Sequence, residues 1–142
     1  MYYTAEVKYK KPNEEGGDDD MTNISSEKYL VEAVSVTDAE AKMTGWKPDN
    51  YHEFEVKAAG IQDLDSVITE GDSEQYWLSR IFFPTETPKG KIKWASFQAM
   101  VNGENINEAL KNVQKEYEGE STSGYEVRKI EFSKIIVDLD LL

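Results

Sequence analysis

The sequence contains no cysteine, and this absence removes a whole group of structures and activities. Disulfide scaffolds, iron–sulfur clusters, cysteine-based zinc sites and cysteine nucleophiles are all excluded. There is only one histidine, His52, whereas zinc sites and catalytic triads built on imidazole need further groups around it. We therefore expect no metal site, no cofactor and no catalytic residue, and a protein that is not an enzyme.

Long apolar runs are missing as well. No stretch approaches the roughly 20 apolar residues of a membrane-spanning helix. The opening MYYTAEVKYK alternates in polarity and lacks the apolar core of a signal peptide. The sequence thus predicts a protein without membrane contact, in a cytoplasmic compartment.

Positive charge is scarce, since the formal net charge is -12 and the pI is about 4.5. Such a surface repels phosphate backbones, so we expect no direct contact with nucleic acid. The densest acidic cluster is Asp18, Asp19 and Asp20, in the segment KPNEEGGDDDMTN. It lacks the alternating ligands of a calcium loop, which favours a solvated hairpin tip and a candidate interaction surface over a cation site.

What the sequence does contain is a set of alternating segments rich in aromatic residues, which make up 11% of the chain. Residues 3–9 and 77–83 alternate in the same way, and so do residues 29–33 and 97–101. Alternation with a period of two is typical of strands with one face in a core. The offsets between the matching segments are 74 and 68 residues.

A helix and a third strand are expected after each pair of strands. Thr37 with Glu40, and Asn105 with Glu108, have the spacing of a capping box at the start of a helix. FEVK at residues 54–57 matches YEVR at residues 125–128, at an offset of 71. The 142 residues suit a single domain, 1–142, in which pseudo-repeats 1–68 and 76–142 flank a polar linker, 69–75.

The predicted fold class is therefore α+β, with two ββαβ repeats, one helix per repeat and one shared, mainly antiparallel sheet arrangement. Each half has a single helix, which covers a sheet poorly, so we expect the halves to share a core. Strand 92–101 is apolar on both faces. Such a strand is usually covered on both sides, either by the other half or by a second subunit.

One basic patch has an aromatic neighbour, formed by Lys89, Lys91, Lys93 and Trp94. These residues could bind a small anionic ligand such as a nucleotide. Alternating lysines also protect an exposed strand from pairing with another chain, and this second interpretation is the favoured one.

Several segments resemble a known family, namely YYTAEVKY, YLVEAVSVTDAEAKM, FEVK and YWLSRIFF. The segment VNGENINEAL differs from the family's usual sequence. The family consists of short proteins of unknown function from Bacteroidota and their phages. The resemblance covers nearly the whole chain but transfers no functional residue. It implies a phage or mobile-element protein in a bacterial cytoplasm.

Three hypotheses follow for the function. The first is a non-enzymatic acidic binding protein, homo-oligomeric, that acts on a host or phage protein. The second is an anti-defence protein that sequesters a nucleotide signal through the Lys89–Trp94 strand. The third is a small enzyme of unknown class.

Overall fold

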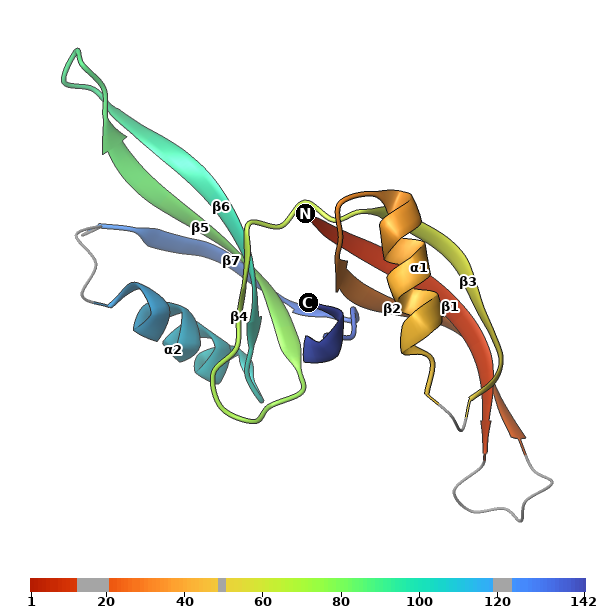
Figure 1. The fold of residues 1–142 in the computed structure, drawn as a ribbon. Helices are drawn as coiled ribbons and strands as arrows, with labels where there is room; N and C mark the ends of the chain where they lie inside the picture. The colour runs from red at the N-terminus through yellow and green to blue at the C-terminus, as the bar shows by residue number, and fades with distance from the viewer. Residues whose placement is uncertain (13–20, 49–50, 119–123) are drawn as a thin grey trace. The chain divides into compact units, whose positions relative to one another are not determined.

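The computed structural model describes residues 1–12, 21–48, 51–118 and 124–142. The fold is mixed α+β, consists mostly of strands, and contains two sheets and two α-helices within these ranges. The chain divides into two compact units, the first formed by Met1–Gln62 with Ile135–Leu142 and the second by Asp63–Lys134. Figure 1 labels the helices and strands of the two units.

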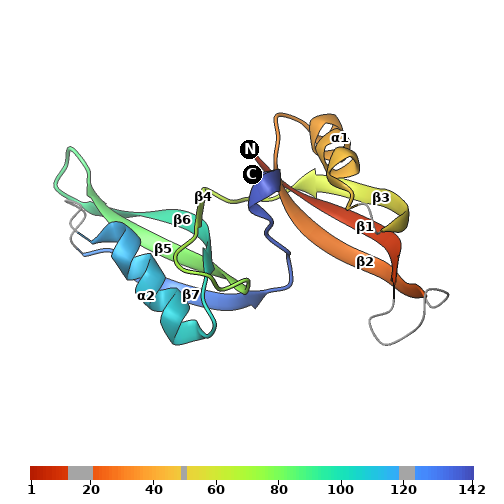
Figure 2. The ribbon, with the colours of Figure 1, turned by 60° about the horizontal axis from the view of Figure 1, so that its bottom comes forward.

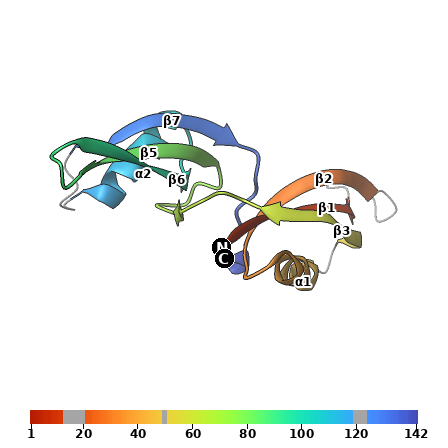
Figure 3. The same cartoon turned by 90° about the horizontal axis from the view of Figure 1, so that it is seen from above.

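The first unit is a three-stranded antiparallel sheet with one helix. Its strands are β1 (Tyr2–Pro12), β2 (Met21–Glu32) and β3 (His52–Ile61), in the order β2-β1-β3. Helix α1 (Val36–Trp46) lies along one face of this sheet, as Figure 3 shows. The alternating residues of β1 point toward α1 and form the core with the helix and the neighbouring strands; the buried set includes Tyr3, Ala5, Val7, Tyr9, Val31 and Met43.

A segment from the far end of the sequence completes the first unit. Ile136 forms a parallel bridge with Tyr29, where the Leu30 N–H donates to the Ile136 carbonyl (2.9 Å) and the Ile136 N–H donates to the Lys28 carbonyl (2.8 Å). The short 3₁₀ helix η1 (Leu139–Leu141) follows, and Leu141 is only 5% exposed within the same core. The first unit is thus closed by residues that follow the second unit in sequence.

The second unit is a four-stranded sheet with one helix. Its strands are β4 (Ser66–Ile68), β5 (Tyr76–Glu86), β6 (Ile92–Asn102) and β7 (Glu126–Ser133), in the order β4-β6-β5-β7. Strand β4 is parallel to β6, and the other pairs are antiparallel. Helix α2 (Ile106–Tyr117) packs on one face of the sheet (Figure 2), over a core that includes Ile81, Ala99, Val101, Ala109 and Val113.

The expectation of one shared sheet arrangement is wrong, because the described strands form two separate sheets. Strand β1 is flanked on both sides by strands of its own unit, and so is β5. Each helix covers its own sheet, and the two core clusters have no residue in common. The buried residues of the described ranges thus include one core cluster in each unit.

The two helices begin at capping residues, one of which differs from the prediction. Asn105 caps α2 as expected, since its side chain accepts the Glu108 N–H at 2.9 Å. Helix α1 is capped by Ser35, whose side chain accepts the Asp38 N–H at 3.0 Å, and the predicted Thr37–Glu40 capping box is wrong. The reason is that Ser35 has an extended backbone while Thr37 already lies inside the helix.

The turn from β6 into α2 depends on a close backbone approach at Gly103. A Cβ atom built there would lie 2.6 Å from the backbone nitrogen of Ala109, which leaves no room for a side chain. The Gly103 carbonyl also accepts the indole N–H of Trp77 at 2.8 Å. Next to it, the fully buried Asn102 accepts the Glu70 N–H (2.7 Å) and donates to the Glu70 carbonyl (2.8 Å), which fixes the loop before β5.

Candidate functional site

The β5–β6 hairpin exposes apolar side chains on the face of its sheet that is opposite α2. Directly opposed residues of an antiparallel pair share a face, and Trp94 is opposed by Pro84 while Ser96 is opposed by Phe82. Ile81 and its neighbours point the other way, into the core below α2. On the outer face Ile92 is 66% exposed and Trp94 is 41% exposed, so this face offers apolar surface to solvent.

Arg128 reaches across this outer face from β7. Its guanidinium lies 4.2 Å from the ring centroid of Phe82 and 5.0 Å from that of Trp94, and its Nε donates to Glu126 at 2.9 Å. Such cation–π contacts contribute about 0.5–1 kcal/mol each at exposed sites. We call the group of Phe82, Pro84, Ile92, Trp94 and Arg128 the hairpin surface.

A β-bulge places Arg128 there. Arg80 pairs with Lys129, whereas Ile81 pairs with Val127, so Arg128 is the extra residue in β7. A bulge bends the strand and re-aims the side chain of its extra residue. Arg128 is not among the residues predicted from the sequence, although the broken alternation of YEVRKIEF is the signal of such a bulge.

The lysines of the predicted basic patch do not share one face with Trp94. Lys93 is opposed by Thr85 and points to the α2 side of the sheet, while Trp94 points to the outer side. Lys89 and Lys91 flank Gly90, whose φ of 77° permits the tight turn, and the Lys91 carbonyl accepts the Thr87 N–H at 2.7 Å. All three lysines are exposed, and none forms an ion pair with another described residue.

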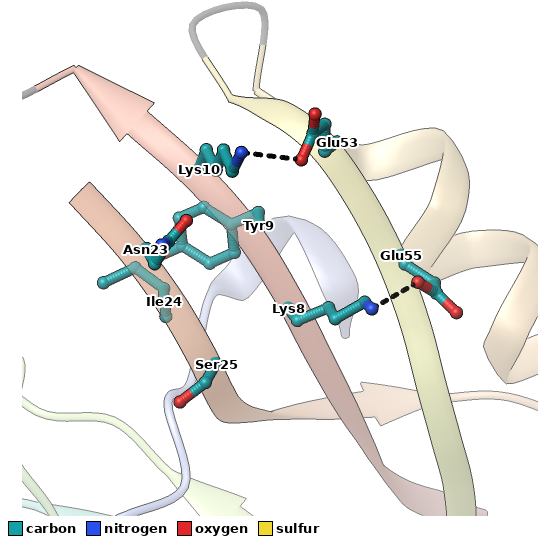
Figure 4. Close-up of a pocket in the computed structure, with 8 residues that line it drawn as sticks. All are labelled: Lys8, Tyr9, Lys10, Asn23, Ile24, Ser25, Glu53 and Glu55. Atoms are coloured by element: carbon teal, nitrogen blue, oxygen red, sulfur yellow. Dashed lines mark ion pairs between the residues drawn. The ribbon is translucent and has the colours of Figure 1, made fainter. Parts of the chain in front are cut away.

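A polar hollow of about 380 Å³ lies on the first unit (Figure 4). Two ion pairs cross its wall, Lys8–Glu55 at 3.0 Å and Lys10–Glu53 at 3.1 Å. Their side chains are between 41% and 71% exposed, and each lysine is already matched by a carboxylate. The hollow therefore offers little uncompensated charge with which to select a ligand, and exposed pairs of this kind contribute about 0–1 kcal/mol.

Beside this hollow, two buried tyrosines share one carboxylate. The hydroxyls of Tyr9 and Tyr29 donate to the same Glu27 oxygen, at 2.8 and 3.0 Å, and the ring of Tyr51 stacks on Tyr9 at 4.2 Å. Burial, followed by the hydrogen bond to Glu27, raises the pKa of Tyr9, and burial next to the Glu27 charge raises that of Tyr29. Because of these raised pKa values, both phenols stay protonated at neutral pH and act as hydrogen-bond donors within the core. A tyrosine that acts as a base would instead need a lowered pKa.

Metal-holding clusters and membrane-spanning helices are not found in the described ranges. His52 is exposed at the start of β3, and no three acids or histidines of these ranges gather as a metal site. Neither described helix is long and apolar enough to cross a membrane. The acidic interaction residues predicted from the sequence, Asp18, Asp19 and Asp20, lie outside the described residues.

Comparison with known proteins gives a family but no activity. No curated protein and no solved structure matches the chain. A family model described as a domain of unknown function, DUF4494, matches residues 1–138. With nearly its whole length covered by that match, the chain belongs to the DUF4494 family.

Proposed function

We propose that this chain is a non-enzymatic binding protein that recognises another protein through the hairpin surface. The observation that carries this proposal is the exposure of Trp94 and Ile92 beside Arg128, on a sheet face that α2 does not cover. Tryptophan and arginine are the residues most enriched among those that dominate binding energy at protein interfaces. An exposed aromatic held in place by a cation has little conformational freedom to lose on binding.

The alternative of a small anionic ligand has less support. A nucleotide would need Trp94 for stacking and the lysines for its phosphates, yet Lys93 and Trp94 lie on opposite faces of β6. An enzyme has the least support, because His52 is exposed and the raised pKa values of Tyr9 and Tyr29 keep both phenols protonated.

The biological setting belongs to the same proposal. The motifs that resemble proteins of Bacteroidota and their phages support a phage or mobile-element protein in the cytoplasm of a bacterial host. The net charge of -12 supports a target, of host or phage origin, whose overall charge is positive, because long-range attraction depends on the whole surface and not on the lysines of the hairpin alone. Exposed apolar residues such as Ile92 also support a homo-oligomer as one form of the protein.

We further propose that the two units are repeats of one ββαβ element. Pairing in the first unit sets Tyr3 opposite Val31 and Ile61, and pairing in the second sets Trp77 opposite Val101 and Phe132. These partners are related by offsets of 74, 70 and 71 residues. For the second strand of each unit, the offset is 70 residues instead of the 68 expected from the sequence. The same offset of 70 relates the helix caps Ser35 and Asn105.

A shared irregularity adds support for the repeat. In the first unit Glu6 pairs with Ala58 and Val7 with Val56, so Lys57 is the extra residue. The same offsets relate Lys57 to Arg128, the extra residue of β7. Bulges at matching positions are expected when two units descend from one ancestor, because bulges are inherited within families.

Site-specific photocrosslinking in bacterial cells tests the binding function. A photoreactive amino acid replaces Ile92 on the hairpin surface, and the matched control replaces Ile106, which is 48% exposed on α2 of the same unit. We expect a discrete adduct with a protein from position 92 and none from position 106. Equal labelling from both positions, or no adduct from position 92, would contradict the proposal.

A further inference from the structure

Strand β6 has an open edge along half of its length. Strand β4 pairs with β6 only at Ala99, Met100 and Val101, and the strand order places β4 on the side of β6 away from β5. Residues 92–97 of β6 therefore have no strand partner on that side among the residues that the structure describes. Figure 1 shows β4 beside only one end of β6, with the β5–β6 hairpin extending beyond it.

The backbone bonds of neighbouring residues show which N–H and C=O groups of β6 point toward the open edge. The carbonyls of Lys91 and Ala99 accept bonds from β5 residues or from the turn that follows β5. The backbone groups of Gln98 point away from β5, since its carbonyl accepts the Asp65 N–H at 2.8 Å and its N–H donates to the Asp65 carboxylate at 2.8 Å. Alternation along a strand then directs the N–H and C=O groups of Ile92, Trp94 and Ser96 toward the open edge.

The side chains along this edge define what an added strand would meet. On the outer face lie Ile92 and Trp94, both exposed and apolar. On the opposite face lie Lys93 and Ala95, with Lys91 just before the strand. A strand placed next to β6 directs its own side chains alternately to these two faces, apolar next to Trp94 and acidic next to the lysines.

Resting on the proposed function, we infer that the open edge of β6 binds an extended segment of a partner protein by strand addition. The segment is about six residues long, and it alternates between apolar and acidic residues. Main-chain bonds to Ile92, Trp94 and Ser96 hold it, while three lysines without ion pairs among the described residues complement its acids.

A second copy of this chain fits the same edge less well. If β6 of one copy paired with β6 of another, the lysines of both hairpins would come together, and like charges in neighbouring strands are destabilising. Charge complementarity thus favours a segment of a different protein. Self-association at this edge is an outcome that the experiment must detect.

Synthetic octapeptides test strand addition on the full chain. The probe alternates valine and aspartate, and its control has the same composition with the valines and the aspartates in separate blocks. Binding is followed by the amide NMR signals of Ile92 and Ser96, and by the tryptophan fluorescence, to which Trp94 contributes together with Trp46 and Trp77. We expect the alternating peptide to bind at least about tenfold more tightly than the block isomer, because only alternation matches both faces.

Backbone methylation distinguishes strand addition from simple charge attraction. One variant of the probe carries N-methyl groups on the valines, and another carries them on the aspartates. In a strand only one of these sets faces β6, so we expect one variant to lose about tenfold or more in affinity and the other to bind nearly as well as the parent. Equal effects from both variants would overturn the inference.

Charge reversal completes the test. Lys91→Glu combined with Lys93→Glu should weaken binding of the alternating peptide by about tenfold, whereas Lys111→Glu, an exposed position on α2, should change it less than about twofold. A peptide that binds equally to all variants, or a chain that instead dimerises through this edge, overturns the inference. If crosslinking from position 92 persists while the peptides fail, the protein-binding function stands and strand addition falls.

Discussion

Substitution of Gly103 gives the sharpest test of how the second unit is packed. In Gly103→Ala the new Cβ would lie 2.6 Å from the backbone nitrogen of Ala109 and 2.9 Å from its Cα. Favourable contacts of this kind lie at about 3.5–4.0 Å, so α2 or the end of β6 has to move by about 1 Å. The contacting atoms are backbone atoms of a helix, which cannot rotate away as a side chain can.

The expected loss follows from what this movement disturbs. Overpacking costs about 1–3 kcal/mol, and here it also separates α2 from the core that buries Val113 completely. The indole N–H of Trp77 donates to the Gly103 carbonyl, so the same shift weakens that bond. A loss of this size lowers the midpoint of thermal unfolding by roughly 10 °C for a unit of this length.

Hydrogen exchange followed by mass spectrometry is the assay, because it reports each unit separately. We expect amides of β6 and α2 to exchange about 5- to 150-fold faster in Gly103→Ala, with the first unit unchanged. The matched control is Gly45→Ala in α1, where a Cβ meets nothing within 4 Å and stability should rise by up to about 1 kcal/mol. Unchanged exchange in Gly103→Ala would refute the close packing of β6 and α2.

Three further predictions concern the first unit. Leu141→Ala removes a buried side chain and should lower the free energy of unfolding by about 2–3 kcal/mol, whereas Leu139→Ala, at a position 58% exposed, should change it by less than about 0.5 kcal/mol in chemical denaturation. Ser35→Ala removes the cap of α1 and should cost about 1 kcal/mol, and Thr37→Ala should cost much less; a larger effect at Thr37 would restore the sequence-based assignment. The two tyrosines bonded to Glu27 have raised pKa values, so their contribution to stability is complete below about pH 10, the pKa of an unfolded tyrosine, and declines as the pH rises toward the folded pKa values. Unfolding curves measured between pH 8 and 11 should therefore show stability falling only above about pH 10. A fall that begins below pH 9 would argue against the buried cluster.

Much of the secondary structure could be predicted because its signals are local. The alternation from Tyr3 to Tyr9 marks β1, and the stripe that includes Ala109 and Val113 marks α2. Asn105 was identified as a cap because it directly precedes a clear apolar stripe. At α1 the cap is Ser35, two residues before the predicted Thr37, and its extended backbone angles identify it.

The number of sheets could not be predicted, because sheet formation depends on which strands pair over long distances. The alternation of β1 is the same whether its neighbours come from its own half or from the other. The outward direction of Trp94 follows from the alternation of side chains between the two faces of β6. The position of Arg128, by contrast, depends on a bulge that interrupts this alternation within β7. The packing of the segment around Ile136 against β2 has no local signal that distinguishes it from an unpaired end.

Completion of the first unit by Ile135–Leu142 has a consequence for the order of events during synthesis. The ribosome makes Met1–Gln62 first, but the segment that covers the edge of β2 and buries Leu141 is made only after all of Asp63–Lys134. Domains usually fold in the order in which they are translated. Here the second unit has all of its own segments before the first unit is complete, so the amino-terminal core is the later of the two to close, and until then the β2 edge beside Leu30 is open to other chains in the cell.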